Sequence, residues 1–222
     1  FQAQPDLEER LAESGATALA GKVSAAAELA QVSFVIQEQP LGLGHAVLTA
    51  EEAVAGEPFV VILPDDIIAH SPGVVAQMLK VHENTGGGVV AVEPMPWERV
   101  HNYGVVDATP VDDRVHQIQG LVEKPTRQEA PSNLTIVGRY ILPPEIFDHL
   151  RRTPPGTNGE IQLTDALLLL LTHHELYAYE FLGTRYDGGT PLGLLRASLE
   201  FGLAREDTRQ EVLALLKTLQ SE

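Results

Sequence analysis

The sequence predicts an α/β fold with a mixed, mostly parallel central sheet, flanked by helices and followed by a C-terminal helical appendage. Phe59–Leu63 is a continuous apolar run, typical of a strand buried on both faces. Ser71-Pro72 marks the start of a helix that Gly86 ends, and Val89–Val92 is another apolar strand. Strand, helix and strand at this spacing favour a right-handed crossover between parallel strands.

The segments before Phe59 predict two helices, a strand and a further helix. A first helix starts near Asp6, Gly15 interrupts it, and a second helix continues to about Ala30. Ser33–Gln37 is rich in β-forming residues and predicts a strand. After a Pro-Leu-Gly-Leu-Gly turn, we expect a helix from His45 to about residue 55.

The second half favours antiparallel strands and ends in helices. A Pro-Val-Asp-Asp turn between two β-rich runs predicts a hairpin. The expected elements are the hairpin strands Tyr103–Asp107 and His116–Glu123, the strands Leu134–Leu142 and Tyr177–Leu182, and helices after Pro143, over Thr164–His174, after Thr190 and after Thr208. The last helix carries an apolar stripe of Val212, Leu215, Leu216 and Leu219. The stripe could pack on its own domain, which we favour, or on another copy in a homo-oligomer.

Composition excludes several classes of protein. The 222 residues carry 31 acidic and 15 basic side chains, a formal charge of −16, and no cysteine. This charge argues against binding to nucleic acid or to an anionic membrane, and a phosphorylated ligand would call for a metal cation. Ala166–Leu171, the longest apolar run, is far short of the roughly 20 residues that span a bilayer. With no signal-peptide pattern in the first 30 residues, we expect a cytoplasmic protein.

Some polar residues are candidates for a site, and each has a structural alternative. Asp65 and Asp66 directly follow a buried strand, where ligands bind in open α/β sheets, but a turn or helix cap is about as plausible. Gly42-Leu43-Gly44-His45 resembles a phosphate loop without its later glycine, and is a weak signal. Taken by itself, Glu123-Lys124-Pro125 is typical of an exposed ion pair. The glycine-rich turn at Asp187 is, by itself, an ordinary turn.

Taken together and in order, these segments closely resemble the bacterial UTP–glucose-1-phosphate uridylyltransferase family of sugar nucleotidyltransferases. The resemblance covers nearly the whole chain and implies a Rossmann-like nucleotidyltransferase fold. Its segments are Pro-Leu-Gly-Leu-Gly-His-Ala at 40–46, Leu-Pro-Asp-Asp at 63–66, Asn-Tyr-Gly-Val-Val-Asp at 102–107, Val-Glu-Lys-Pro at 122–125, Val-Gly-Arg-Tyr at 137–140, Gly-Glu-Ile-Gln-Leu-Thr-Asp at 159–165 and Arg-Tyr-Asp-Gly-Gly at 185–189.

The resemblance implies an enzyme that makes UDP-glucose and pyrophosphate from UTP and glucose 1-phosphate. Gln37 and the backbone of Gly42 would bind the uracil edge. Asp65 and Asp187 would hold a Mg²⁺ cofactor, whose octahedral shell phosphate oxygens and water would complete. Asp65 is thereby one of the expected catalytic residues.

The same resemblance implies a site for the sugar phosphate. Lys124, the other expected catalytic residue, would contact the phosphate of glucose 1-phosphate, while Glu123 and the backbone at Gly104 and Gly138 would hold sugar hydroxyls. The sugar phosphate would attack the α-phosphorus of UTP in line and expel pyrophosphate. Residues 1–190 are expected to form the catalytic domain, and residues 191–222 a C-terminal helical segment.

In one respect the sequence departs from the family. The family has a strand and a glycine-rich loop with a basic pair near its N-terminus, and no such segment precedes Phe1. We therefore expect these 222 residues by themselves to be inactive. Two alternatives stay open, namely a thymidylyl- or other nucleotidyltransferase and a catalytically dead nucleotide-sugar-binding homologue. The roles of His45, Asp66, Gln162 and Asp165 also stay open.

Overall fold

The computed structural model describes residues 3–156 and 158–220, which divide after Glu38 into two compact units. The first unit is a pair of helices, α1 (Pro5–Glu13) and α2 (Thr17–Glu28), joined at Gly15, which has a φ of 79°. Both helices are where the sequence predicts them. The strand expected at Ser33–Gln37 is wrong: the segment has no regular structure, and Phe34 and Ile36 are 72% and 80% exposed. A strand requires a neighbour to accept its hydrogen bonds, and no described strand pairs with this segment.

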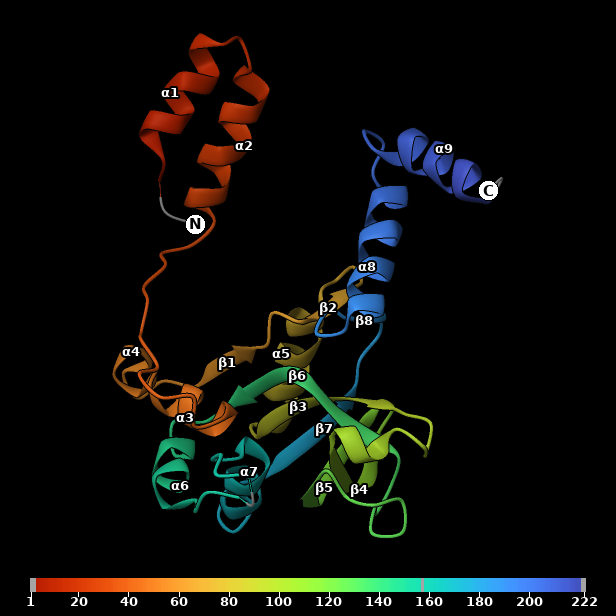
Figure 1. Ribbon diagram of the computed structural model, residues 1–222. Coiled ribbons are helices and arrows are strands. Elements are labelled where there is room, and N and C mark those ends of the chain that lie inside the picture. Colours follow the sequence, from red (N-terminus) through yellow and green to blue (C-terminus); the bar gives the residue numbers. More distant parts are fainter. Residues whose placement is uncertain (1–2, 157, 221–222) are drawn as a thin grey trace. The chain divides into compact units, whose positions relative to one another are not determined.

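The second unit contains the sheets and the remaining helices (Figure 1). Its elements, in chain order, are α3 (Leu43–Leu48), α4 (Glu51–Val54), β1 (Phe59–Ile62), β2 (Asp66–Ala69), α5 (Val74–Thr85), β3 (Gly88–Pro94), the 3₁₀ turn η1 (Val100–Asn102), β4 (Gly104–Asp112), β5 (Val115–Glu123), β6 (Leu134–Leu142), α6 (Ile146–Arg152), α7 (Leu163–Leu170), β7 (Leu176–Glu180), β8 (Thr184–Asp187), α8 (Pro191–Ala204) and α9 (Arg209–Gln220).

The central sheet has six strands in the order β1-β6-β3-β7-β5-β4 and is mixed, as predicted. The expected predominance of parallel pairs is wrong, because among the described strands only β3 and β7 pair in parallel. β1 and β3 do run in the same direction, as the crossover through α5 requires. They are not neighbours, because β6 inserts between them and runs antiparallel to both.

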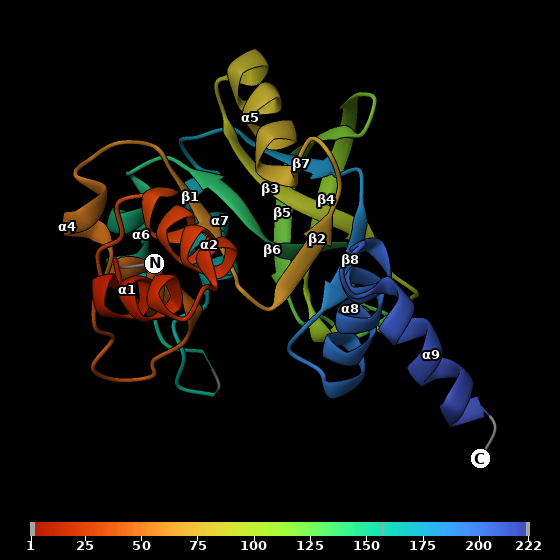
Figure 2. The same cartoon turned by 90° about the horizontal axis from the view of Figure 1, so that it is seen from above.

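Alternate residues of the strands pack on opposite faces of the sheet. On one face, α5 contributes Met78 to a cluster with Val89 and Ala91 of β3. On the other face, α3, α6 and α7 pack against Val90 and Val92 of the same strand. Figures 1 and 2 show the resulting layers, with α5 on one side of the sheet and the shorter helices on the other. The sheet therefore has a core on each face, as an α/β fold requires.

Two features at the carboxyl end of β1 differ from the sequence expectation. β1 is an edge strand of the sheet, so it is half-buried and Ile62 is 54% exposed, whereas burial on both faces was expected. Beyond β1, the four-residue strands β2 and β8 pair antiparallel as a separate ribbon that the sequence analysis did not predict. This ribbon brings residues more than a hundred positions apart into register.

The C-terminal helices α8 and α9 make up the helical segment that the sequence predicts from residue 191 onward. That this segment is separate from the catalytic domain stays a prediction. Thr190 caps α8 by accepting from the Gly193 N–H at 3.1 Å. α9 packs on α8, where Val212 approaches Gly202, but Leu215 and Leu219 of its stripe are more than half exposed. Within the described part of the chain, no helix is long and apolar enough to span a bilayer.

Candidate active site

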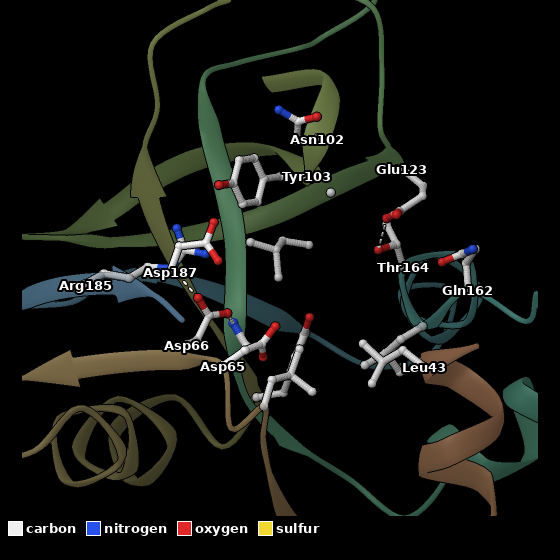
Figure 3. Close-up of a pocket in the computed structure, with 16 residues that line it drawn as sticks. Leu43, Asp65, Asp66, Asn102, Tyr103, Glu123, Gln162, Thr164, Arg185 and Asp187 are labelled. Atoms are coloured by element: carbon white, nitrogen blue, oxygen red, sulfur yellow. Dashed lines mark hydrogen bonds and ion pairs between the residues drawn. The ribbon is translucent and has the colours of Figure 1, made fainter. Parts of the chain in front are cut away.

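A cavity of about 240 Å³ lies beside the middle of β6, near the ends of β1, β5 and β8 and the start of β4 (Figure 3). Many of the sequence motifs meet at this one place. The lining residues are Leu43, Leu63, Asp65, Asp66, Asn102, Tyr103, Gly104, Glu123, Ile136, Gly138, Tyr140, Gln162, Leu163, Thr164, Arg185 and Asp187. Five of the predicted site residues are among them, namely Asp65, Gly104, Glu123, Gly138 and Asp187.

The ribbon of β2 and β8 brings Asp65 and Asp187 together. Asp66 and Asp187 are directly opposite in its register, and the Gly188 N–H donates to the Asp65 carbonyl at 2.7 Å. A Cβ built on Gly189 would lie 3.1 Å from Asp65 Oδ2 and 3.3 Å from Asp187 Oδ1. The two carboxylates therefore face one point, and only a residue without a side chain leaves that point open.

Asp66 is the anchor of this arrangement. Its carboxylate accepts from Arg185 Nε and, at 2.7 Å, from the Gly138 N–H. Arg185 also donates to Glu93 Oε1 at 3.0 Å, and the side chains of Asp66 and Arg185 are only 10% and 8% exposed. The pair thus ties β8 to β3 and β6, and Asp66 is engaged with the protein itself.

The charge of Arg185 is maintained despite its burial. Burial by itself lowers the pKa of Arg185, but Tyr103, Asp66 and Glu93 outweigh this effect and raise the pKa above its ordinary value. Its guanidinium also lies 5.4 Å from the centroid of the Tyr103 ring. Arg185 therefore stays a cation that compensates two carboxylates within the fold.

The opposite wall of the cavity is built around Glu123. Thr164 Oγ1 donates to Glu123 Oε2 at 2.7 Å, and Gly104 lies opposite Glu123 in the β4–β5 register. A Cβ on Gly104 would come within 3.0 Å of Thr164 Oγ1 and 3.2 Å of Glu123 Oε2. Burial and the charge of Glu123 raise the pKa of Asp165, one position beyond Thr164. This wall offers oriented oxygen acceptors, which suit the hydroxyls of a polyol.

Lys124 lies beside the cavity rather than in its lining. Its backbone has a φ of 45°, and its N–H donates to the Tyr103 carbonyl at 3.1 Å. The Nζ atom is 3.7 Å from Glu123 Oε1, and the side chain is 54% exposed. Because this exposed ammonium group lies next to Glu123, which lines the cavity, the long side chain is able to reach a ligand at the rim.

Gly138 contributes space rather than backbone donors. Its N–H donates to Asp66, and its carbonyl accepts from the Leu63 N–H at 2.8 Å and from Arg139 at 3.0 Å. A Cβ there would lie 2.5 Å from Leu63 Cβ, so no larger residue fits. The expectation that its backbone holds a sugar hydroxyl stays a prediction.

The predicted nucleotide residues are separate from this lining. Gly42 has a φ of 92°, and a Cβ there would lie 2.7 Å from Glu160 Cβ, which fixes the turn before α3 against the Gly-Glu-Ile-Gln segment. The Gly44 N–H donates to the Ile161 carbonyl at 2.9 Å, and the next residue after Gly42, Leu43, lines the cavity. Gln37 belongs to the first compact unit, Phe1–Glu38.

The donor set fits magnesium. Asp65 and Asp187 supply carboxylate oxygens around an open point, and Mg²⁺ commonly takes one or two protein carboxylates together with phosphate oxygens and water. Within the part of the chain that the structure describes, no cluster of three or more His, Asp or Glu residues has metal-binding geometry. A metal at this point would therefore depend on its ligand for most of its coordination.

Several residues of this cavity have no role that the sequence motifs predicted. Thr164 orients Glu123, Arg185 pairs with Asp66, Tyr103 lies against Arg185, and Asn102 and Gln162 line the cavity. All of them lie in the quoted motifs, at or within two residues of an assigned residue or in the Gly-Glu-Ile-Gln-Leu-Thr-Asp segment. Their position inside the motifs was the available signal.

Comparison with known proteins identifies the family. Residues 7–202 match the profile of the nucleotidyl transferase family, which is most of the chain. The chain belongs to the nucleotidyl transferase family. Within it, the chain is 40% identical over 220 residues to the UTP–glucose-1-phosphate uridylyltransferase of Bacillus subtilis, covering 99% of this chain and 75% of that protein. The protein of the same name from Staphylococcus epidermidis is 39% identical over 219 residues, covering 99% of this chain and 76% of that protein.

Solved structures agree with this placement. A UDP-glucose pyrophosphorylase complexed with UDP-glucose matches with a TM-score of 0.80 and 42% identity, covering 84% of this chain and 72% of that one. The UTP-bound enzyme from Acinetobacter baumannii matches with a TM-score of 0.88 and 35% identity, covering 97% and 76%. The resemblance in the sequence and the nucleotidyltransferase fold are both confirmed, and the chain is that of an enzyme of this family.

Asp66 gives the first test. We predict that Asp66→Asn lowers the free energy of unfolding by roughly 3 kcal/mol, because the buried Arg185 loses one of its two carboxylate partners. The matched control is Glu51→Gln, which removes a partner from Arg151 on the surface and should cost about 0–1 kcal/mol. Urea unfolding of both variants measures the difference, and equal losses would contradict the anchoring role of Asp66.

Proposed function

We propose that this enzyme transfers the uridylyl group of UTP to glucose 1-phosphate, giving UDP-glucose and pyrophosphate. The convergence of Asp65 and Asp187 on one point, beside the wall of Glu123 and Thr164, carries the proposal. An acidic pair suited to Mg²⁺ next to acceptors suited to a sugar is what this reaction requires. The proteins of 39–40% identity carry the uridylyl name, which favours this assignment over a thymidylyltransferase or an inactive homologue.

We assign the metal to Asp65 and Asp187. Mg²⁺ bound there would offset the charge of the triphosphate and polarise the α-phosphorus. The protein positions the two metal-binding carboxylates. The β2–β8 ribbon carries them, and the pair of Asp66 and Arg185 holds the ribbon in place. Gln37 and the backbone of Gly42 are assigned to the uracil edge.

We assign the sugar phosphate to the opposite wall. Glu123, oriented by Thr164, would accept hydrogen bonds from sugar hydroxyls, and the backbone at Gly104 and Gly138 is assigned to sugar hydroxyls as well. Lys124, whose Nζ lies near Glu123 at the rim, would pair with the phosphate. The main contribution of the protein is to hold the attacking phosphate oxygen in line with the α-phosphorus, which makes a bimolecular step effectively unimolecular.

Two further assignments follow from the chain. UTP and glucose 1-phosphate are intracellular metabolites, and a chain without cysteine suits a reducing compartment, so we place the enzyme in the cytoplasm. The exposed leucines of α8 and α9 are compatible with association into a homo-oligomer.

The reaction itself is the direct test. In the natural protein, we expect pyrophosphate release from UTP and glucose 1-phosphate in the presence of Mg²⁺, with UTP preferred over dTTP and ATP at equal concentration. Asp65→Asn should abolish turnover, whereas Asp148→Asn, an exposed aspartate on α6, should leave it unchanged. A preference for dTTP would refute the uridylyl assignment, and full activity of Asp65→Asn would refute the metal site.

Lys124 gives a second test. Removing its charge with Lys124→Ala should raise the KM for glucose 1-phosphate by roughly tenfold or more, since an ion pair with a phosphate is lost, and should change the KM for UTP much less. Lys80 on α5 lines none of the cavities described here, so Lys80→Ala is the control. Equal changes in both KM values would contradict the assignment of Lys124 to the sugar phosphate.

A further inference from the structure

A second cavity, of about 330 Å³, lies next to the candidate active site. It shares Arg185 and Asp187 with the first cavity, and the rest of its lining comes from Tyr186 of β8, the end of β3, the loop after β3, and the N-cap and first turns of α8. None of the substrate roles proposed above uses these other residues. The volume suits a small molecule rather than a polymer.

Besides Arg185, two arginines line this cavity, and neither of them forms an ion pair within the described residues. Arg99 donates to the Tyr103 hydroxyl at 3.4 Å, and the guanidinium of Arg196 lies 5.9 Å from the centroid of the Tyr186 ring. In a chain of net charge −16, Arg99 and Arg196 therefore place two cations with aromatic partners beside one cavity.

The lining as a whole carries three arginines against two acidic residues, Glu93 and Asp187. Arg185 pairs with Glu93 and also with Asp66. The 14-residue helix α8 starts here, so its first N–H groups add a partial positive charge to the cavity wall. The remaining acid, Asp187, faces the point assigned to the metal. The aromatic contacts hold both guanidinium groups in place and leave most of their N–H donors available.

We propose that this cavity is a second, non-catalytic site for a small phosphorylated anion, bound by Arg99 and Arg196. Planar guanidinium groups form paired hydrogen bonds to phosphate oxygens, and two of them on one cavity match a phosphate dianion. The ligand chemistry has two sources, namely free phosphate and the pyrophosphate that the proposed reaction releases. Only the second source rests on the proposed function.

Titration calorimetry tests the site. The natural protein is first saturated with UDP-glucose, without a divalent metal, so that the catalytic cavity is filled, and inorganic phosphate is then added. We expect one phosphate to bind per chain, and the double variant Arg99→Gln and Arg196→Gln to weaken it by roughly tenfold or more. Arg152→Gln, which removes an exposed arginine of α6 outside the cavity, should bind like the wild type.

A second arm uses pyrophosphate in place of phosphate under the same conditions. Tighter binding of pyrophosphate, lost in the double variant, assigns the site to the product, and tighter binding of phosphate assigns it to the free ion. Undetectable binding of both ions, equal binding to wild type and double variant, or an equal loss in Arg152→Gln would overturn the proposal. The initial UDP-glucose titration reports separately on the proposed function, and unfolding midpoints establish that the variants are folded.

Discussion

The buried pair of Asp66 and Arg185 is the contact on which the candidate active site depends. β2 and β8 are four residues long and form a separate ribbon, so their backbone pairing alone is a weak support. Asp66 binds both Arg185 and the Gly138 N–H, and Arg185 extends the connection to Glu93 on β3. The ribbon is thereby fixed to the central sheet, and Asp65 and Asp187 are held facing each other.

This arrangement divides neighbouring carboxylates between two tasks. Asp66 is buried and compensated, whereas Asp65, one position earlier, faces the point that Asp187 also faces. The division follows from position, since Asp65 lies in the turn before β2, whereas Asp66 is the first residue of the strand and is held by Arg185 and the Gly138 N–H. An acidic enzyme is able to bind acidic substrates in this way, because its metal-binding carboxylates are separated from those that stabilise the fold. The positive lining of the second cavity, around Arg99 and Arg196, adds a local exception to the net charge.

The sequence predicted the elements of the fold better than their pairing. The apolar run at Phe59, the hairpin and the helix ending at Gly86 were recognised because each has a local pattern. The antiparallel insertion of β6 between β1 and β3 was not, because neighbours in a sheet are decided by long-range packing. For the site, Asp65 had a local signal, while Asp187 and Lys124 were assigned only through the family resemblance. Arg185 and Thr164 were missed, because their roles consist of contacts to distant residues.

The central claim is that the ribbon places Asp65 and Asp187 on one metal ion. A crystal structure of the natural protein with Mg²⁺ and UDP-glucose tests it most directly. The account predicts one ion with an oxygen of Asp65 and an oxygen of Asp187 each at about 2.0–2.1 Å, its remaining ligands being phosphate oxygens and water. Asp66 should stay paired with Arg185 in that structure. An ion coordinated by Asp66, or by only one of Asp65 and Asp187, would contradict the account.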